Sequence, residues 1–257
     1  MSERSYWTTG EIRKRIMDEF GKDLSIPTIH RYMRKFGYHL KKPYTIDYRR
    51  PENAEGLLIE NLENTVSKIL SKGISIENVA IGFLDETYVQ SNPNTVRFWT
   101  KLKKFVKRVN SDKTRKSLLG FYAFVGNDVC IEIENSGKFE ICKAIKKIKE
   151  ENSKYDAIII ILDNFPSHKS KMVKELAEEL NVFLVYLPPY SPDLNPIEFI
   201  WKCLKRFISK LSILDTEEII KQCINEYYKL SSKLSYSKKF INDILKNTSL
   251  KSFSKIF

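Results

Sequence analysis

The chain has 257 residues, 42% hydrophobic and 30% charged, and its formal net charge is +12. This length suits one large or two modest domains with a hydrophobic core, and the positive excess favours a polyanionic partner unless it reflects only a lysine-rich composition. Because no apolar stretch approaches about 18 residues, a transmembrane helix is excluded, and the polar N-terminus predicts a cytoplasmic protein without a membrane partner.

Four cysteines are widely spaced along the chain, at Cys130, Cys142, Cys203 and Cys223. None forms a CxxC pair, and no pair of histidines lies nearby at the spacing of a zinc site. We therefore expect the cysteines to be reduced, mostly buried and chemically inert.

Residues 1–43 are predicted to form a small all-α domain. Thr8 or Thr9 can cap a first helix that ends at Gly21, and Pro27 lies near the start of a second helix. The side chains expected to face inward are Ile12, Ile16 and Phe20 on the first helix and Ile26, Ile29 and Met33 on the second. Two short helices joined by a tight turn are typical of a helix-turn-helix, although any small helical hairpin has the same pattern.

The second of these helices has a basic outer face. The residues left for that face are Thr28, His30, Arg31, Arg34 and Lys35. Because the whole chain is also basic, we expect this face to contact double-stranded DNA.

Residues 44–77 are predicted to be a linker that contains one helix, over 52–72. The apolar stripe of this helix consists of Leu58, Leu62, Val66, Ile69 and Leu70.

From residue 78 to 257 the pattern changes to that of an α/β domain. Strand-like runs lie at 79–84, 95–100, 117–125, 129–133, 157–162 and 182–187, and helices are predicted at 138–151, at 168–180 and from Pro196. On the first of these helices we expect Phe139, Cys142, Ile145 and Ile148 to face inward. The run 157–162 is apolar on both faces, which indicates a central strand covered by helices on both sides.

Two of these apolar runs are each followed by an acid, Asp85 after 79–84 and Asp163 after 157–162. An acid just past a buried strand lies at the edge of the sheet where α/β proteins place their sites. If the two strands are parallel neighbours, the carboxylates lie side by side and repel unless a cation such as Mg²⁺ neutralises them. Each acid taken alone is better explained as an ordinary turn residue at a strand end, whereas for the two together both explanations are about equally good.

A third acid, Glu198, opens the last predicted helix. With Asn195 as the cap and Pro196 at the first position, Glu198 fits a capping box, which requires no catalysis. Alternatively it is a metal ligand, followed by Lys202 and Lys205 along the same edge of the helix as phosphate contacts. The sequence leaves both interpretations open.

The motifs Leu84-Asp-Glu86, Leu162-Asp-Asn164 and 188–198 (PPYSPDLNPIE), with 34 residues between Asp163 and Glu198, resemble a known family. They are similar to the DDE transposases of prokaryotic insertion sequences related to mariner. The resemblance covers roughly residues 78–210 strongly and the helix-turn-helix more loosely. It implies an RNase H-like mixed sheet flanked by helices.

The resemblance also implies a function. Asp85, Asp163 and Glu198 would be catalytic and would ligate two Mg²⁺ ions, for which Mn²⁺ can substitute. The enzyme would cut the ends of an insertion sequence and join the 3′-hydroxyl to target DNA, typically at a TA step. It would act as a homodimer on terminal inverted repeats in the nucleoid, and the helix at 52–72 is the candidate dimer surface.

Asn164, His168 and Asn195 are candidate supporting residues. Asn164 and His168 either orient Asp163 or contact a phosphate, with capping or packing as the alternative. A basic stretch that contains Lys103, Lys104, Lys107 and Arg108 is a candidate for phosphate contact, with a solvated hairpin as the alternative. Trp99 lies just before this stretch, and we expect it to pack in the hydrophobic core rather than to stack on a flipped base. Family members usually begin with two helix-turn-helix units and this chain shows one, so a silent or truncated transposase-derived DNA-binding protein is the alternative function.

Overall fold

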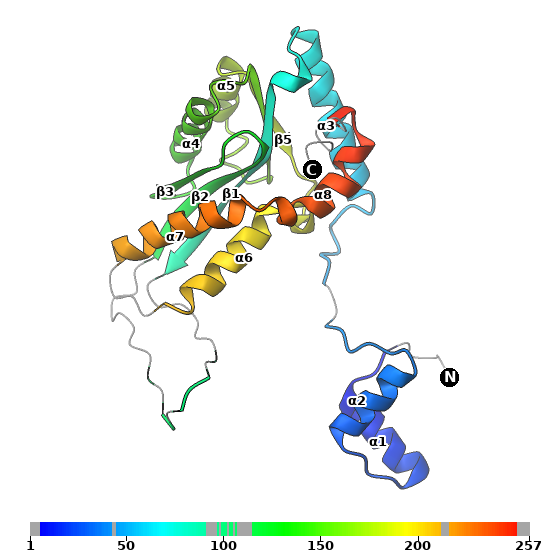
Figure 1. Cartoon of the computed structure of the whole chain (residues 1–257). Helices are drawn as coiled ribbons and strands as arrows, with labels where there is room; N and C mark the ends of the chain where they lie inside the picture. Colours follow the sequence, from blue (N-terminus) through cyan, green and yellow to red (C-terminus); the bar gives the residue numbers. More distant parts are fainter. Residues whose placement is uncertain are drawn as a thin grey trace. The chain divides into compact units, whose positions relative to one another are not determined.

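The computed structural model describes residues 6–42, 45–90, 97, 99–101, 103, 104, 106, 115–211 and 216–250. It divides into two compact units, Met1–Ile46 and Asp47–Phe257. Each unit is described by itself, and Figure 1 labels their elements.

The smaller unit is a pair of helices, α1 (Thr9–Phe20) and α2 (Ile26–Lys35). Thr8 caps α1 in a capping box with Glu11, and Gly21 ends it at a φ of 63°. Among the described residues of this unit only Ile29 is buried, and Phe20, which we expected to face inward, is 68% exposed. The described residues of this unit form no third helix or strand that could cover that face, so the expectation for Phe20 is wrong.

The larger unit is built on a five-stranded sheet of mixed direction in the order β3-β2-β1-β4-β5. Its strands are β1 (Val79–Gln90), β2 (Arg115–Val125), β3 (Val129–Ile133), β4 (Ala157–Leu162) and β5 (Val182–Tyr186). The first three pair antiparallel, whereas β1, β4 and β5 run parallel. The predicted α/β class is therefore confirmed, with the wholly buried β4 in the interior of the sheet.

Strand β1 is longer than the sequence pattern indicates. It continues past Asp85 to Gln90, because residues up to Gln90 pair with β2 and the alternate side chains Thr87 and Val89 are buried. Asp85 therefore lies inside a strand and not beyond its end, which corrects the expectation. Of the strand-like run at 95–100, residues 97, 99 and 100 are described, and none of them is in a strand.

Helices cover both faces of the sheet (Figure 1). The helices α4 (Lys138–Glu151) and α5 (Lys171–Glu179) share one core with side chains such as Leu84 and Ile160. The helices α6 (Ile197–Ile208), α7 (Thr216–Ser231) and α8 (Lys238–Asp243) share the other core, with Phe83 and Ile161. On α4 the prediction for Phe139 is wrong, since this ring is 68% exposed while Ile141 and Ala144 are buried.

Helix α3 (Ala54–Ser71), expected in a linker, contacts β5 in the larger unit. Its side chains Leu58, Leu62, Val66 and Ile69 are at most 1% exposed and belong to the core that also holds α6 and α7. Only Leu70 of the predicted stripe is exposed. The larger unit therefore buries this apolar stripe in its own core, and the stripe is not a free surface for dimerisation.

No described helix is both long and apolar enough to cross a lipid bilayer. The four cysteines are free thiols, and three of them, Cys130, Cys142 and Cys223, are buried, as the sequence indicates.

Candidate active site

Asp85 is held in the interior of the larger unit by two donors. The backbone N–H of Glu86 donates to Oδ1 at 2.9 Å, and the indole Nε1–H of Trp201, from α6, donates to Oδ2 at 3.1 Å. Burial raises the pKa of Asp85 well above its usual range, and the negative charges of Glu198, Glu86 and Asp163 raise it further. This carboxyl group therefore lies in a concentrated negative field.

A glycine makes room for the indole. Gly120 pairs directly with Asp85 across the antiparallel ladder. A Cβ atom at Gly120 would lie only 2.5 Å from Cη2 of Trp201, so the ring fills the place of the missing side chain. The sequence pattern alone does not reveal the contact between Trp201 and Gly120, because that contact depends on the pairing of distant segments.

Asp163 follows β4 directly, as expected, since that strand ends at Leu162. The last pair of the parallel register is Phe83 with Ile161, so Asp85 and Asp163 each lie two residues beyond it along their own segments. The Asp163 side chain is 52% exposed, and its Oδ1 lies 2.7 Å from Nδ1 of His168. Partial burial alone would raise the pKa of Asp163, but the hydrogen bonds from His168 and from the Phe165 N–H lower it.

His168 is wholly buried between two carboxylates. Its Nε2 lies 3.2 Å from Oε1 of Glu86, on the other side of the ring from Asp163. Burial alone would lower the pKa of His168, but its two carboxylate partners raise it to about 10, so that the ring is an imidazolium at neutral pH. As expected for a continuing strand, Glu86 points away from Asp85, and it contacts this ring.

Glu198 is the second residue of α6 and is exposed. Of the two interpretations left open by the sequence, the capping box is not formed, because Pro196 occupies the N-cap position and no side chain caps the helix. The carboxylate is therefore free of a structural role at the helix end. Burial of the carboxyl group raises the pKa of Glu198, Lys205 opposes this shift, and the charge of Asp163 adds to it.

The two asparagines near the acids have different surroundings. Asn164 donates its side-chain N–H to the backbone carbonyl of Leu187, and so ties the residue after Asp163 to the segment that leads towards α6. Asn195 is 4% exposed, and its Oδ1 is buried without a hydrogen-bond partner among the described residues. It is not the helix cap that the sequence predicts.

The donor set suits a hard divalent cation. In their present rotamers, the described residues include no group of three His, Cys, Asp or Glu side chains arranged to hold a metal ion. His168 engages one oxygen of Asp163, and Trp201 engages one of Asp85. The three carboxylates nevertheless lie close enough for Asp163 and Glu198 to raise the pKa of Asp85. Oxygen ligands of this kind fit Mg²⁺ or Mn²⁺.

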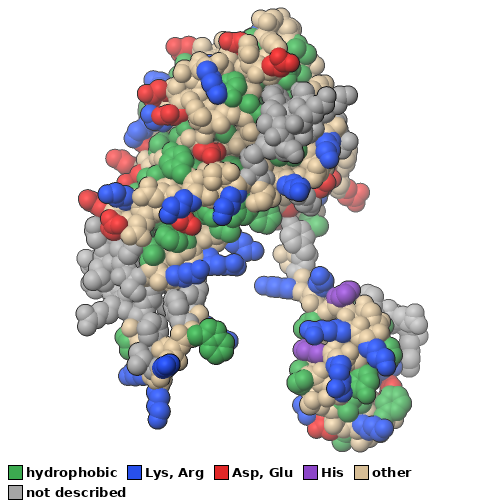
Figure 2. All heavy atoms as spheres, viewed as in Figure 1, with side chains coloured by type: hydrophobic (Ala, Val, Ile, Leu, Met, Phe, Trp, Pro, Cys, Tyr) green, Lys and Arg blue, Asp and Glu red, His purple; other side chains and the backbone are tan. Residues whose placement is uncertain are grey.

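The candidate DNA contacts of the smaller unit are partly exposed. Arg31, Arg34 and Lys35 are exposed on α2. Thr28 and His30 are half-buried, and Nε2 of His30 lies 3.0 Å from Oγ1 of Thr9 on α1. The interpretation of His30 as an outer-face residue is thus wrong, because it joins the two helices. Figure 2 shows basic and hydrophobic side chains intermingled on the visible face of this unit.

Further candidate contacts lie in the larger unit. Lys103 and Lys104 are exposed, whereas Lys107 and Arg108 lie outside the described residues. Trp99 is fully exposed, so the expectation that it fills core is wrong. Lys202 and Lys205 are exposed along α6, and the Lys205 ammonium lies 5.1 Å from the centre of the Tyr88 ring.

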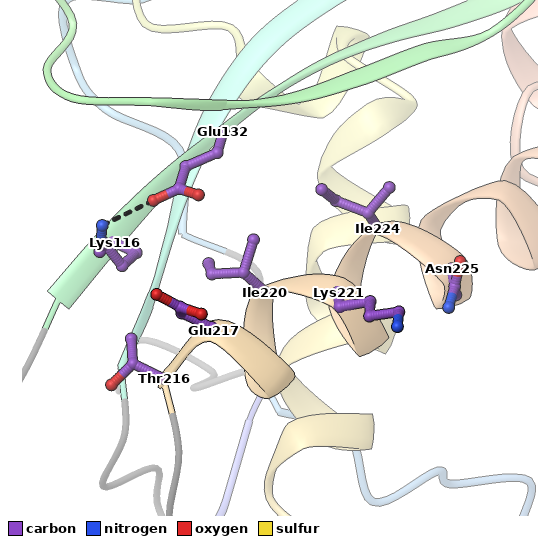
Figure 3. Close-up of a pocket in the computed structure, with 8 residues that line it drawn as sticks. All are labelled: Lys116, Glu132, Thr216, Glu217, Ile220, Lys221, Ile224 and Asn225. Carbon is purple, nitrogen blue, oxygen red and sulfur yellow. Dashed lines mark hydrogen bonds and ion pairs between the residues drawn. The ribbon is translucent and has the colours of Figure 1, made fainter.

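A cavity of about 430 Å³ lies apart from the acids, between the β2–β3 hairpin and α7 (Figure 3). Charged residues line it, including Lys221 and an ion pair between Lys116 and Glu132 at 2.7 Å. None of the three acids, Asp85, Asp163 or Glu198, lines this cavity.

Two families match parts of the sequence. Residues 80–220 match the family described as DDE superfamily endonuclease, and residues 3–52 match the winged helix-turn-helix family. The second match, with the two helices of the smaller unit, supports the predicted helix-turn-helix.

Two curated relatives are proteins of transposable elements. An uncharacterised 39 kDa protein of insertion element IS630 from Shigella sonnei is 23% identical over 212 residues, which are 81% of this chain and 60% of that protein. The Tcb2 transposase of Caenorhabditis briggsae is 42% identical over 52 residues, which are 20% of this chain and 19% of that protein. The chain thus spans less than two thirds of the length of these relatives.

Solved structures of the Mos1 transposase share the fold. A paired-end complex with the left transposon end matches 95% of this chain and 81% of that one, with a TM-score of 0.53 and 16% identity. A paired-end complex with Mg matches 99% of this chain and 79% of that one, with a TM-score of 0.54 and 17% identity. Because the DDE match covers more than half of the sequence and contains all three acids, this chain belongs to the DDE superfamily endonucleases.

Proposed function

We propose that the protein is a transposase of the type found in mariner-related insertion sequences. It cuts DNA at the ends of its element and joins the resulting 3′-hydroxyl to target DNA at a TA step. The observation that carries this proposal is that the DDE endonuclease match contains Asp85 in β1, Asp163 just after β4 and Glu198 at the start of α6. Asp163 and Glu198 lie close enough to raise the pKa of the half-buried Asp85, so the three acids need a cation to be ionised together.

Asp85, Asp163 and Glu198 would hold two divalent cations, Mg²⁺ or Mn²⁺. When bound, such cations activate water and stabilise the oxyanions of a phosphodiester displacement. The chain itself positions the ligands. Trp201 fixes one oxygen of Asp85, and the rigid start of α6 after Pro196 sets the place of Glu198.

Basic residues on both units would hold the DNA. Lys202 and Lys205 follow Glu198 along α6 at helical spacing, where they can contact the phosphates next to the reacting bond. Arg31, Arg34 and Lys35 on α2 would bind the terminal inverted repeats. A homodimer would pair the two element ends, and the DNA-bound protein would be associated with the nucleoid.

A DNA-binding protein derived from a transposase but without activity is the second candidate. The match of residues 3–52 to the winged helix-turn-helix family supports DNA binding independently of the three acids. The two candidates share DNA binding and differ only in strand cleavage.

Strand cleavage of a supercoiled plasmid carrying the native element ends separates these functions. We expect the wild-type protein with Mg²⁺ to nick at the ends, and Asp163→Asn to bind them without nicking. Asp156→Asn is the matched control, because Asp156 lies at the opposite end of β4 and bonds to Asn78. Binding by the wild type without any nicking, in Mg²⁺ and in Mn²⁺, would favour the inactive DNA-binding protein.

A further inference from the structure

A buried chain of hydrogen bonds connects Glu86, His168 and Asp163. The two contacts are 3.2 Å from Glu86 Oε1 to Nε2 and 2.7 Å from Nδ1 to Asp163 Oδ1. The histidine side chain has no exposed surface and that of Glu86 is 13% exposed, whereas the Asp163 side chain is 52% exposed. The ring thus links a carboxylate inside the protein to one that faces solvent.

The fold fixes the positions of Glu86 and of the His168 backbone. Glu86 lies in β1, opposite Leu119 of β2, and the alternation of side chains places it on the other face of the sheet from Asp85. The backbone of His168 is held by its own N–H to the Phe165 carbonyl and by the Tyr186 hydroxyl, which donates to the His168 carbonyl, both at 3.0 Å. Because the His168 backbone is fixed in this way, the contact with Glu86 can affect only the side-chain torsions of the imidazole.

The contact with His168 determines which oxygen of Asp163 remains for a ligand. The described hydrogen bonds to this carboxylate, from His168 and from the Phe165 N–H, both end on Oδ1. Oδ2 is therefore the oxygen that can face a cation. Metal-ligating groups are commonly oriented by such outer partners.

We infer that Glu86 is a positioning residue, which holds the ring of His168 so that Asp163 presents Oδ2 to a divalent cation. This inference rests on the proposed function and adds to it a residue outside the three acids. Without Glu86 the ring could rotate about its χ2 torsion, and Asp163 Oδ1 would lose its partner.

Binding of MnCl2 to the full-length protein without DNA, measured by titration calorimetry, tests this role. We expect Glu86→Ala to weaken Mn²⁺ binding by about 10- to 100-fold, the usual loss for an outer partner of a ligand. Glu86→Gln should stay within about threefold of wild type, because its amide oxygen still accepts a hydrogen bond from Nε2. Glu132→Ala is the matched control, since Glu132 is a strand acid of the same sheet that pairs with Lys116 instead.

A second measurement, by NMR spectroscopy of the metal-free protein, reports directly on the imidazole ring of His168. The chain has three histidines, so the imidazole ¹H–¹⁵N signals of His168 can be assigned by comparison with His168→Gln. We expect Glu86→Ala to shift these signals and Glu132→Ala to leave them in place. If Glu86→Ala does not fold, Glu86→Asp carries the test, because its shorter side chain withdraws the carboxylate from Nε2 and should weaken Mn²⁺ binding similarly.

Three outcomes are decisive. Wild-type Mn²⁺ affinity in folded Glu86→Ala or Glu86→Asp overturns the inference and leaves the proposed function standing. Equal Mn²⁺ binding by wild type and Asp163→Asn, or no binding by either, overturns the metal site and the inference with it. Weakened binding in Glu86→Ala, restored by Gln and accompanied by a shifted His168 signal, supports both.

Discussion

Gly120 offers a sharp test of how the fold holds the candidate active site. In Gly120→Ala the new Cβ would lie 2.5 Å and 2.9 Å from Cη2 and Cζ2 of Trp201, and 2.8 Å from Cε2 of Tyr227. Real Cβ atoms essentially never approach so closely, and both rings are at most 1% exposed and cannot move into solvent. The added methyl group must therefore displace the indole that donates to Asp85.

Two opposing effects determine how much Gly120→Ala changes the free energy of unfolding. Overpacking a well-filled core costs about 1–3 kcal/mol, and three contacts on enclosed rings favour the upper end of that range. The smaller entropy of alanine in the unfolded chain returns about 0.4–1 kcal/mol. We expect a net loss of about 2 kcal/mol in the free energy of unfolding, which corresponds to a fall in Tm of about 4–8 °C for a unit of this size.

Thermal unfolding by circular dichroism measures the loss in stability, and Mn²⁺ titration of the folded variant measures the effect on the site. Gly82→Ala is the matched control. Its Cβ would lie 2.5 Å from the Tyr122 carbonyl oxygen and 2.7 Å from the Phe121 ring, which belongs to the core on the opposite face. It should lose similar stability without weakening Mn²⁺ binding. A Tm of Gly120→Ala within 1 °C of wild type would refute the packing argument.

Two further predictions concern charge. The pKa of His168 in the folded protein, about 10, exceeds the ordinary value of 6.5. The protonated ring therefore stabilises the fold fully below pH 6.5, and this stabilisation is lost as the pH rises towards 10. In urea unfolding between pH 6.5 and 10, the free energy of unfolding should fall more steeply for wild type than for His168→Gln, and equal slopes would contradict this. The side chain of Arg50 is 13% exposed and pairs at 2.9 Å with Asp193, in the segment that leads to Glu198. Arg50→Ala should lower the free energy of unfolding by about 1–3 kcal/mol and speed hydrogen exchange over residues 188–198. Unchanged exchange in this segment would argue against an anchoring role.

The sequence by itself determined those helices and strands whose signals, such as caps and hydrophobic periodicity, lie within a few neighbouring residues. Ser25 caps α2, α4 spans the predicted range 138–151, and the run 157–162 forms a buried strand that Asp163 follows. Caps and hydrophobic periodicity arise from residues a few positions apart, so the chain carries them without reference to the rest of the fold. The three acids could be identified for the same reason, since each lies beside such a signal.

Only the tertiary structure decided what surrounds those acids. Pairing with β2 extends β1 through Asp85, Gly120 admits the Trp201 indole, and Glu86 meets His168, which lies 82 residues away. The same long-range packing buries the stripe of α3 in the larger unit and leaves Phe139 exposed. These contacts depend on which segments become neighbours across the sheet, and side-chain pattern along one segment cannot specify its partner.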